Sequence, residues 1–162
     1  MPLVLVRIGL DEAETLWKMQ VRSFAELYAK YQDTMTSPAT EKVEKIEARL
    51  NQPFTYYYYI QDDGVTVGAI RVVDTKSKDE PKRISPLFIL PEYRNKKYAQ
   101  LAIIKAEEIH GNSNWELDTI LQEAGNCYLY EKMGYYQTGK TEVINEKLTL
   151  VFYKKECVNK SL

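Results

Sequence analysis

A basic turn at residues 94–97, Arg-Asn-Lys-Lys, lies between an apolar run and an amphipathic helix, where it can hold a phosphate. The apolar residues 87–90 are typical of a buried strand, and helical spacing of apolar residues begins near Tyr98. The start of a helix carries free N–H groups and is locally positive, so it normally attracts acidic side chains. Cations gathered there indicate an anion among them, and the turn therefore predicts a phosphate-bearing ligand. A solvated basic turn after a strand is the simpler alternative.

A second pair of side chains, Asn126 and Tyr130, lies on a predicted helix at residues 126–133. Because they are four residues apart, they lie on one face of that helix and can point at the same ligand. The alternative is that Tyr130 is one more core aromatic among the 13 tyrosines of the chain. The basic turn favours the ligand-binding interpretation.

Together these two stretches resemble the signature of the Gcn5-related N-acetyltransferase family, known as GNAT. In that family, a strand ending in a Pro-Glu-Tyr-like step leads into a pyrophosphate loop of the form Arg or Gln, two residues, Gly, one residue, Gly or Ala. The corresponding residues here are Arg94, Asn95, Lys96, Lys97, Tyr98 and Ala99. Lys97 stands where the family usually has its first glycine. A residue with helical φ can still present its N–H there, and Lys96 and Lys97 add positive charge.

The second half of the resemblance covers residues 129–135, LYEKMGY, which match the family segment Phe-Tyr-Glu-Lys-Leu-Gly-Phe. The resemblance implies that acetyl-CoA is the cofactor and that Tyr130 protonates the departing thiolate of coenzyme A. It also implies that Asn126 hydrogen-bonds the pantetheine arm and that residues 94–99 hold the pyrophosphate. The end of the preceding strand would pair with the pantetheine like an added strand, and one of its N–H groups would hold the thioester oxygen. The residues of that strand end are Phe88, Ile89 and Leu90.

The general base that deprotonates the amine is expected among the carboxylates, because the only histidine, His110, lies at a predicted helix end. Glu116 and Asp118 are two residues apart on a predicted strand, so they share one face of the sheet. The family often draws its base from this part of the sheet, directly or through water. The alternative is that one or both residues pair with nearby lysines or line a solvated face.

Charge and composition argue against several other classes of protein. The 22 Lys and Arg residues nearly balance the 23 Asp and Glu residues, which leaves a formal net charge of −1 and no broad basic surface. Nucleic acid and membranes are therefore not expected as partners. The apolar start of the chain soon meets Arg7, which is typical of a strand and not of a signal peptide or membrane span, so we expect a cytoplasmic protein. Cys127, Cys157 and His110 follow no metal-ligand spacing, so no metal site is expected.

The elements that must position these residues alternate between strands and helices. Strands are predicted at residues 3–8, 56–61, 65–73, 82–90, 115–119, 135–142 and 147–155. Helices are predicted at residues 11–29, from Ser37-Pro38 to about residue 50, from about residue 98 to 110, and at 126–133. This order follows that of the GNAT family over essentially the whole chain, which implies a single α/β domain, residues 1–162. Its fold would be a mixed, mostly antiparallel sheet of about seven strands flanked by about four helices, with a ligand cleft between the central strands.

Three functions are compatible with these residues. The first is an acyltransferase that moves an acetyl group from acetyl-CoA directly to a primary amine of a small molecule or a protein, with Tyr130 as general acid. The second is a GNAT-like module that binds coenzyme A or acyl-CoA without turnover, and the third is a cofactor-free protein-interaction domain. Arg94, Asn126 and Tyr130 together argue against the third. The acceptor and the acyl length are open, and the family resemblance is compatible with a homodimer.

Overall fold

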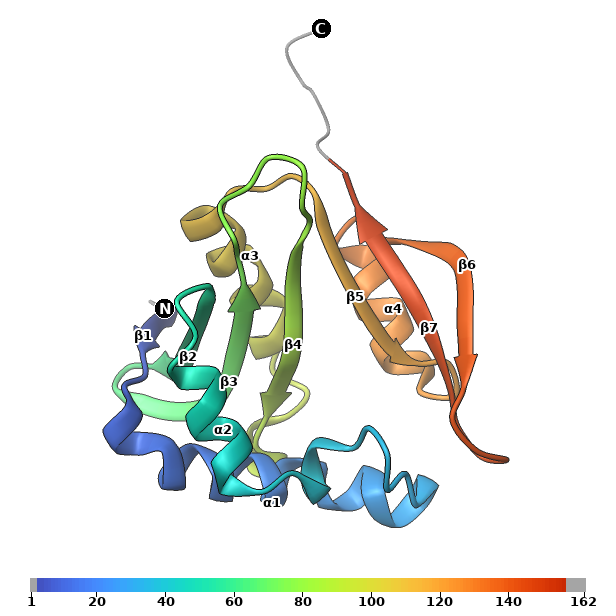
Figure 1. Cartoon of the computed structure of the whole chain (residues 1–162), viewed down its shortest axis with the longest axis horizontal. Helices are drawn as coiled ribbons and strands as arrows, with labels where there is room; N and C mark the ends of the chain where they lie inside the picture. The colour runs from blue at the N-terminus through green and yellow to red at the C-terminus, as the bar shows by residue number, and fades with distance from the viewer. Residues whose placement is uncertain (1–2, 157–162) are drawn as a thin grey trace, which may run out of the picture.

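A seven-stranded sheet with the strand order β1-β2-β3-β4-β5-β7-β6 forms the centre of the protein (Figure 1). The computed structural model describes residues 3–156, so Cys157 lies outside the described residues. The strands are β1 (Leu3–Arg7), β2 (Thr55–Asp62), β3 (Val65–Val73), β4 (Lys82–Ile89), β5 (Trp115–Ile120), β6 (Tyr136–Val143) and β7 (Thr149–Lys155). The helices are α1 (Ala13–Tyr31), α2 (Val43–Leu50), α3 (Tyr98–His110) and α4 (Ala124–Lys132). Neighbouring strands are antiparallel except β4 and β5, which confirms the predicted mixed, mostly antiparallel α/β fold.

The second helix begins later than the sequence predicts. Ser37 does cap a turn, because its Oγ accepts a hydrogen bond from the N–H of Ala39, but this 3-10 turn ends at Thr40. Glu41 and Lys42 are extended, and α2 begins only at Val43. Tertiary contacts hold the extended segment. The carbonyl oxygen of Glu41 accepts a hydrogen bond from Trp17 Nε1 at 2.7 Å, and its carboxylate is bound by side chains from α1 and α2.

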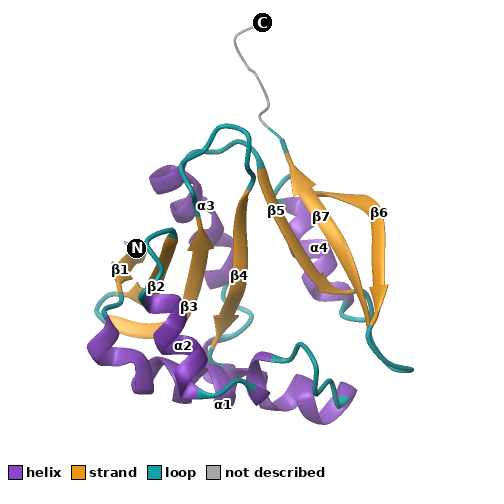
Figure 2. Ribbon diagram, in the orientation of Figure 1, coloured by secondary structure: helices purple, strands orange, loops and turns teal. Residues whose placement is uncertain are grey.

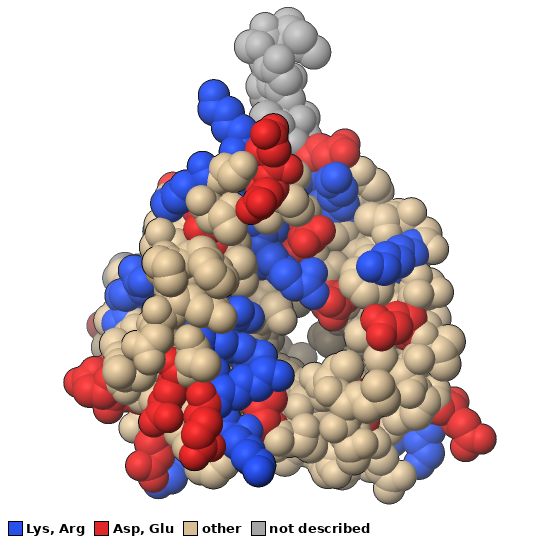
Figure 3. All heavy atoms as spheres, in the orientation of Figure 1, with Lys and Arg blue, Asp and Glu red and all other residues tan. Residues whose placement is uncertain are grey.

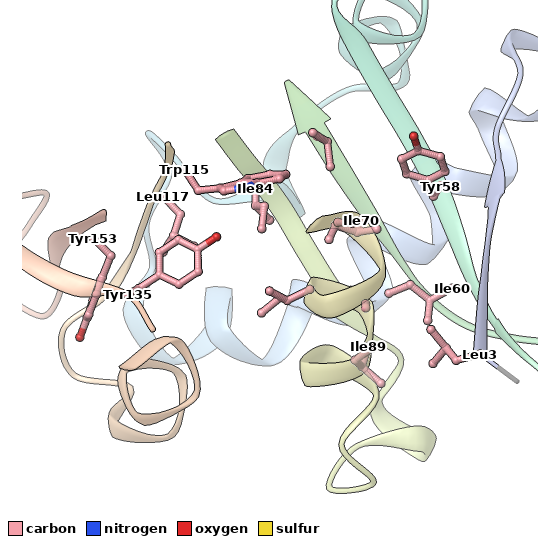
Figure 4. Close-up of a cluster of buried hydrophobic side chains, with 14 of the residues drawn as sticks. Leu3, Tyr58, Ile60, Ile70, Ile84, Ile89, Trp115, Leu117, Tyr135 and Tyr153 are labelled. Carbon is pink, nitrogen blue, oxygen red and sulfur yellow. The ribbon is translucent and has the colours of Figure 1, made fainter. Parts of the chain in front are cut away.

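Helices cover both faces of the first half of the sheet, so β2, β3 and β4 bury side chains on both sides, whereas β6 is exposed along its length (Figure 2). The run of tyrosines in β2 shows the alternation: Tyr57 and Tyr59 pack with residues of α1 and α2, and Tyr58 packs with residues of α3. Figure 4 shows the buried cluster that contains Tyr58, in which Ile70 and Ile89 lie next to α3. No ring of residues 56–59 lines either of the cavities described below, so these tyrosines serve the core.

Strands β4 and β5 are paired only at their beginnings. Lys82 lies opposite Trp115 and Arg83 lies opposite Glu116, and beyond these two pairs the strands diverge, as Figure 1 shows. Strand β5 pairs along its whole length with β7 on its other side. The later part of β4 is therefore left without a neighbouring strand on one edge, and this opening is the predicted cleft between central strands.

No helix within residues 3–156 combines the length and the apolar character that crossing a membrane requires.

Candidate active site

Two cavities open where β4 and β5 diverge. The first, which we call the α3 cavity, has a volume of about 560 Å³ and is lined by α1, the end of β4, the turn before α3, and the starts of α3 and α4. Most of the residues that the sequence predicts to bind a cofactor line it, together with Tyr130. These are Phe88, Ile89, Arg94, Asn95, Lys97, Tyr98, Ala99 and Asn126. Leu90 and Lys96 are not among its lining residues.

The end of β4 presents main-chain groups to the opening. The N–H of Leu90 donates to the carbonyl oxygen of Val67 at 2.8 Å, so Leu90 and Phe88 direct their main-chain groups toward β3. Because these directions alternate along a strand, Leu87 and Ile89 direct theirs away from β3, toward the gap left by β5. Of the predicted residues 88–90, only Ile89 therefore directs main-chain groups to the gap, together with Leu87, and the carbonyl oxygen of Ile89 is bound by Arg94 Nε.

A close approach of β3 and β4 fixes this strand end. A Cβ atom at Gly68 would lie 2.1 Å from the carbonyl oxygen of Phe88, so only glycine allows the two backbones to come together here. Phe88 is buried on the other side of the sheet, where its ring meets that of Phe24 edge to face with centroids 5.8 Å apart. The register of β4 beside the cavity is therefore held by packing.

The turn before α3 exposes N–H groups to the α3 cavity. The first main-chain hydrogen bond of α3 joins the N–H of Leu101 to the carbonyl oxygen of Lys97 at 3.0 Å. Within the described residues, the N–H groups of Tyr98, Ala99 and Gln100 have no main-chain acceptor. All three residues line the cavity. Free N–H groups at the start of a 13-residue helix can bind an anion, so the phosphate site stays a prediction that this geometry allows.

Lys97 does not have the helical φ that we expected. Its φ is +66°, in the left-handed region that favours glycine, and Asn95 has the same value. The glycine usual in the family at this position therefore has a conformational reason that is preserved here, although the residue is lysine. Asparagine tolerates this region better than lysine does.

The guanidinium group of Arg94 is bound by the protein itself. Its Nε donates to the carbonyl oxygen of Ile89 at 2.9 Å, and one Nη donates to that of Ser23 at 2.7 Å. The other Nη donates to the carboxylate of Glu26 at 3.2 Å. The side chain of Arg94 thus joins the turn to the end of β4 and to α1, and its contribution to a pyrophosphate site stays a prediction. Lys96 is exposed to solvent outside the cavity.

Tyr130 lies beneath the opening, with its ring 6.1 Å from that of Tyr135 and 6.2 Å from that of Tyr153, measured between centroids. Burial raises the pKa of Tyr130, and the nearby charge of Asp118 raises it further. The phenol therefore keeps its proton at neutral and mildly alkaline pH. Its hydroxyl group makes no hydrogen bond within residues 3–156, so it is available to a ligand.

Asn126 also lines the α3 cavity, one helical turn before Tyr130. Its main-chain N–H donates to the carbonyl oxygen of Glu123 at 3.0 Å, which fixes the first turn of α4. Glu123 is held in turn by α1, because Lys30 Nζ donates to its carboxylate at 2.9 Å and Tyr31 Oη at 2.5 Å. Burial favours the neutral acid, but these hydrogen bonds outweigh it and lower the pKa of Glu123. The start of α4 is thereby fixed against α1.

The second cavity, which we call the α2 cavity, has a volume of about 980 Å³. It is lined by the segment at residues 33–42, α2, the first half of β4, and strands β5, β6 and β7. The two cavities share Phe24, Leu27, Leu87, Asn126 and Tyr130, so they meet at the tyrosine. Figure 3 shows the molecule hollowed at its centre, between the strands of the first and second halves of the chain.

Glu116 and Asp118 both contact Arg83. Asp118 accepts a hydrogen bond from Arg83 Nη2, and an oxygen of Glu116 lies 3.7 Å from Nη1 of the same side chain. Asp118 lines the α2 cavity and Glu116 lines neither cavity. The ion pairs that we considered as the alternative to a catalytic role are therefore present, with an arginine in place of the expected lysines.

The sequence does not single out the residues of α1 that line the two cavities. Phe24 and Leu27 line both cavities, and Ser23 and Lys30 line the α3 cavity. Phe24 fits the helical spacing of apolar residues and is predicted as core, because periodicity cannot tell a buried face from a face over a cavity. The structure indicates more clearly that Ser23 is available to a ligand, because its buried Oγ has no hydrogen-bond partner in the described part of the chain.

Comparison with known proteins identifies the family. The sequence profile described as "Acetyltransferase (GNAT) domain" matches residues 16–157, most of the chain. The protein belongs to the GNAT family of acetyltransferases. A search of curated proteins finds no match to this GNAT chain.

Solved structures with the same fold are similar over nearly the whole length of this GNAT protein. The PaiA N-acetyltransferase of Thermoplasma acidophilum, in complex with coenzyme A, has a TM-score of 0.72 and 16% identity, over 97% of this chain and 100% of the other. The spermidine N-acetyltransferase of Vibrio cholerae, in complex with CoA and spermine, has a TM-score of 0.74 and 13% identity, over 94% of each chain. The ribosomal-protein-S18-alanine N-acetyltransferase of Escherichia coli has a TM-score of 0.72 and 10% identity, over 99% of each chain. At these identities the likeness shows the fold alone.

Proposed function

We propose that this protein is an acetyl-CoA-dependent N-acetyltransferase that moves an acetyl group directly to a primary amine. The observation that carries the proposal is the position of Tyr130, which lies where the α3 cavity meets the α2 cavity. One cavity would hold the acetyl donor and the other the amine, so that both reach the tyrosine without a covalent enzyme intermediate. The GNAT family and the complexes of two similar structures with coenzyme A support this assignment.

The α3 cavity offers hydrogen-bonding groups that suit coenzyme A. The main-chain groups of Leu87 can pair with an extended amide-containing arm as an added strand would. The free N–H groups at the start of α3 suit a pyrophosphate, and the buried Oγ of Ser23 lacks a partner within the described residues. When bound, acetyl-CoA supplies the acetyl thioester that an amine can attack.

Tyr130 is the general acid in this proposal. Because its pKa is raised, it holds a proton at Oη and can pass that proton to the sulfur as the C–S bond breaks. Asn126, on the same face of α4, can hydrogen-bond the arm that carries the sulfur. The N–H of Ile89 is directed toward the opening, where it can hold the thioester oxygen.

Asp118 is the better candidate for the general base. Both Asp118 and Glu116 were candidates on the sequence, but only Asp118 lines the α2 cavity, where the amine would bind. It would take the proton that the amine loses as the new C–N bond forms, directly or through a water molecule. Its carboxylate accepts a hydrogen bond from Arg83 of β4.

The proposal is tested by mixing the protein with acetyl-CoA and a panel of primary amines, and measuring the release of free thiol together with acetylated product by mass spectrometry. We expect amine-dependent release of coenzyme A by the wild type and a large loss of rate in Tyr130→Phe. Binding of acetyl-CoA without turnover of any amine would instead identify a GNAT-like binding module. Neither binding nor turnover would contradict both assignments.

A further inference from the structure

The first turn of α3 has little local support. Within residues 3–156, no side chain caps the start of the helix, and the preceding residue, Lys97, has a left-handed φ of +66°. The N–H groups of Tyr98, Ala99 and Gln100 have no main-chain acceptor in the described part of the chain. A first turn of this kind depends on tertiary contacts for its stability. The N–H groups that would meet a pyrophosphate therefore need support from elsewhere in the fold.

Asp62, the last residue of β2, provides such a contact. Tyr98 Oη donates a hydrogen bond to Asp62 Oδ2 at 2.5 Å, between residues that are 36 apart in the sequence. This hydrogen bond raises the pKa of Tyr98 above its ordinary value of 10.0, so the hydroxyl group keeps its proton and remains a donor at neutral pH. The first residue of α3 is thereby joined to the sheet.

The backbone of Asp62 is held from both sides. Asp62 lies opposite Leu3 of β1 and opposite Val65 of β3. Its side chain lies on the same face of β2 as that of Ile60, because residues two apart in a strand share a face. Leu3 and Ile60 belong to the buried cluster next to α3 that Figure 4 shows. The carboxylate of Asp62 is therefore presented to α3 from a well-held part of the sheet.

The carboxylate of Asp62 lowers stability at its other oxygen. Asp62 Oδ1 is buried and has no hydrogen-bond partner within the described residues, and a buried polar atom without a partner is destabilising. Asp62 lines neither cavity, so it does not itself contact a ligand there. Holding Tyr98 in place accounts for a carboxylate at this position.

We propose that Asp62 is a positioning residue for the cofactor: through Tyr98, it holds the first turn of α3 where the free N–H groups can bind the pyrophosphate of acetyl-CoA. The inference rests on the proposed acetyltransferase function, whose cofactor site it makes more specific. Arg94 joins the turn before α3 to α1 and to β4, and the hydrogen bond between Tyr98 and Asp62 joins the start of α3 to β2. The pyrophosphate site is thus held from two sides.

Tyr98→Phe tests the hydrogen bond, because it removes one hydroxyl group and keeps both the ring and the main-chain N–H. We expect the Kd for acetyl-CoA to rise about tenfold. The Kd for S-acetylpantetheine, which has the same arm and thioester but no pyrophosphate, should rise much less. Titrations followed by NMR measure both affinities. An equal rise for the two ligands, or no rise for acetyl-CoA, would overturn the inference.

Substitutions at Asp62 separate positioning from charge. Asp62→Ala removes the acceptor of the hydrogen bond, so positioning predicts weaker binding of acetyl-CoA, whereas the loss of a negative charge alone predicts tighter binding. Asp62→Asn keeps an oxygen acceptor for Tyr98 and should restore most of the affinity. Asp63→Asn is the matched control, since it removes the same charge at an exposed neighbour that lines neither cavity, and it should not weaken binding. Binding that is as tight in Asp62→Ala as in the wild type, or tighter, would refute the proposal.

Hydrogen exchange of the free protein separates this inference from the proposed function. The N–H of Leu101 bonds to the carbonyl oxygen of Lys97 at the start of α3, and that of Gly111 bonds to Glu107 at its end. Asp62→Ala should lower the protection of Leu101 about tenfold and leave that of Gly111 unchanged. An equal loss at both ends, or no loss at Leu101, refutes the positioning role. A wild type that binds no acetyl-CoA would instead contradict the proposed function.

Discussion

The α3 cavity and the α2 cavity share five residues but are built in different ways. The α3 cavity offers main-chain groups from the end of β4 and the start of α3, together with side chains of α1 and α4. The α2 cavity uses side chains from the segment at residues 33–42, α2 and four strands. Main-chain recognition needs a particular backbone shape and therefore leaves a local sequence pattern. Recognition by side chains that are far apart in the sequence leaves no such pattern. The sequence therefore predicts the residues of the α3 cavity better than those of the α2 cavity, on which acceptor selectivity would depend.

The largest effect is expected from Tyr130→Phe, because this residue lies where the two cavities meet. Removing one hydroxyl group should lower kcat by about 10²–10⁴-fold, the usual contribution of a general acid, and leave the affinity for acetyl-CoA and for the amine unchanged. Steady-state kinetics and calorimetry on the same variant measure these quantities separately. An unchanged kcat would show that the thiolate leaves without protonation by this residue.

The pH dependence distinguishes titration in the α3 cavity from titration of the acceptor. The pKa of Tyr130 is raised above its ordinary value of 10.0, so its protonated form persists as the pH rises to about 10. Below pH 10, the neutral fraction of an alkylamine with a pKa near 10 rises about tenfold with each unit increase in pH. We expect kcat/KM to rise about 100-fold between about pH 7 and 9 with no falling limb. A falling limb near about pH 8 that disappears in Tyr130→Phe would mean that the pKa of Tyr130 is lowered.

Arg94→Ala tests whether the arginine positions the turn. The variant loses three hydrogen bonds that join the turn to β4 and α1, so we expect the Kd for acetyl-CoA to rise about 10- to 100-fold. The KM for the amine should change much less, because Arg94 does not line the α2 cavity. A salt titration of acetyl-CoA binding is the second readout. A direct contact between Arg94 and phosphate would reduce the salt dependence in the variant, and a positioning role would not.

These residues also show which parts of the structure the sequence could predict. The order of elements, the open edge of β4 and the helix face shared by Asn126 and Tyr130 follow from apolar periodicity and from the family pattern. The partners of Arg94 could not be predicted, because Ser23 and Glu26 lie some 70 residues earlier, on a helix whose apolar spacing indicates only packing. For the same reason, Glu116 and Asp118 could be placed on one strand face but not beside Arg83.

Lys97→Gly should produce the smallest effect. The substitution removes a left-handed lysine, which we expect to raise stability by roughly 0.5–1 kcal/mol and the affinity for acetyl-CoA by a few-fold. Thermal unfolding and calorimetry measure the two effects. Asn95→Gly, at the same φ, is the matched control and should gain less, because asparagine already tolerates this conformation. A loss of stability in Lys97→Gly would show that the lysine side chain makes a compensating contribution.

The thermal midpoint with and without acetyl-CoA is the most direct test of the central claim that the α3 cavity binds the acetyl donor. Gly125 lines this cavity, and a Cβ atom there would meet nothing within 4 Å, so Gly125→Phe should fill the cavity without disturbing the fold, and Gly125→Ala should leave it open. At about 100 times its Kd, acetyl-CoA should stabilise the wild type and Gly125→Ala by about 2.7 kcal/mol, or several degrees, and should not stabilise Gly125→Phe. No shift of the wild type at millimolar acetyl-CoA, or an equal shift in Gly125→Phe, would contradict the account.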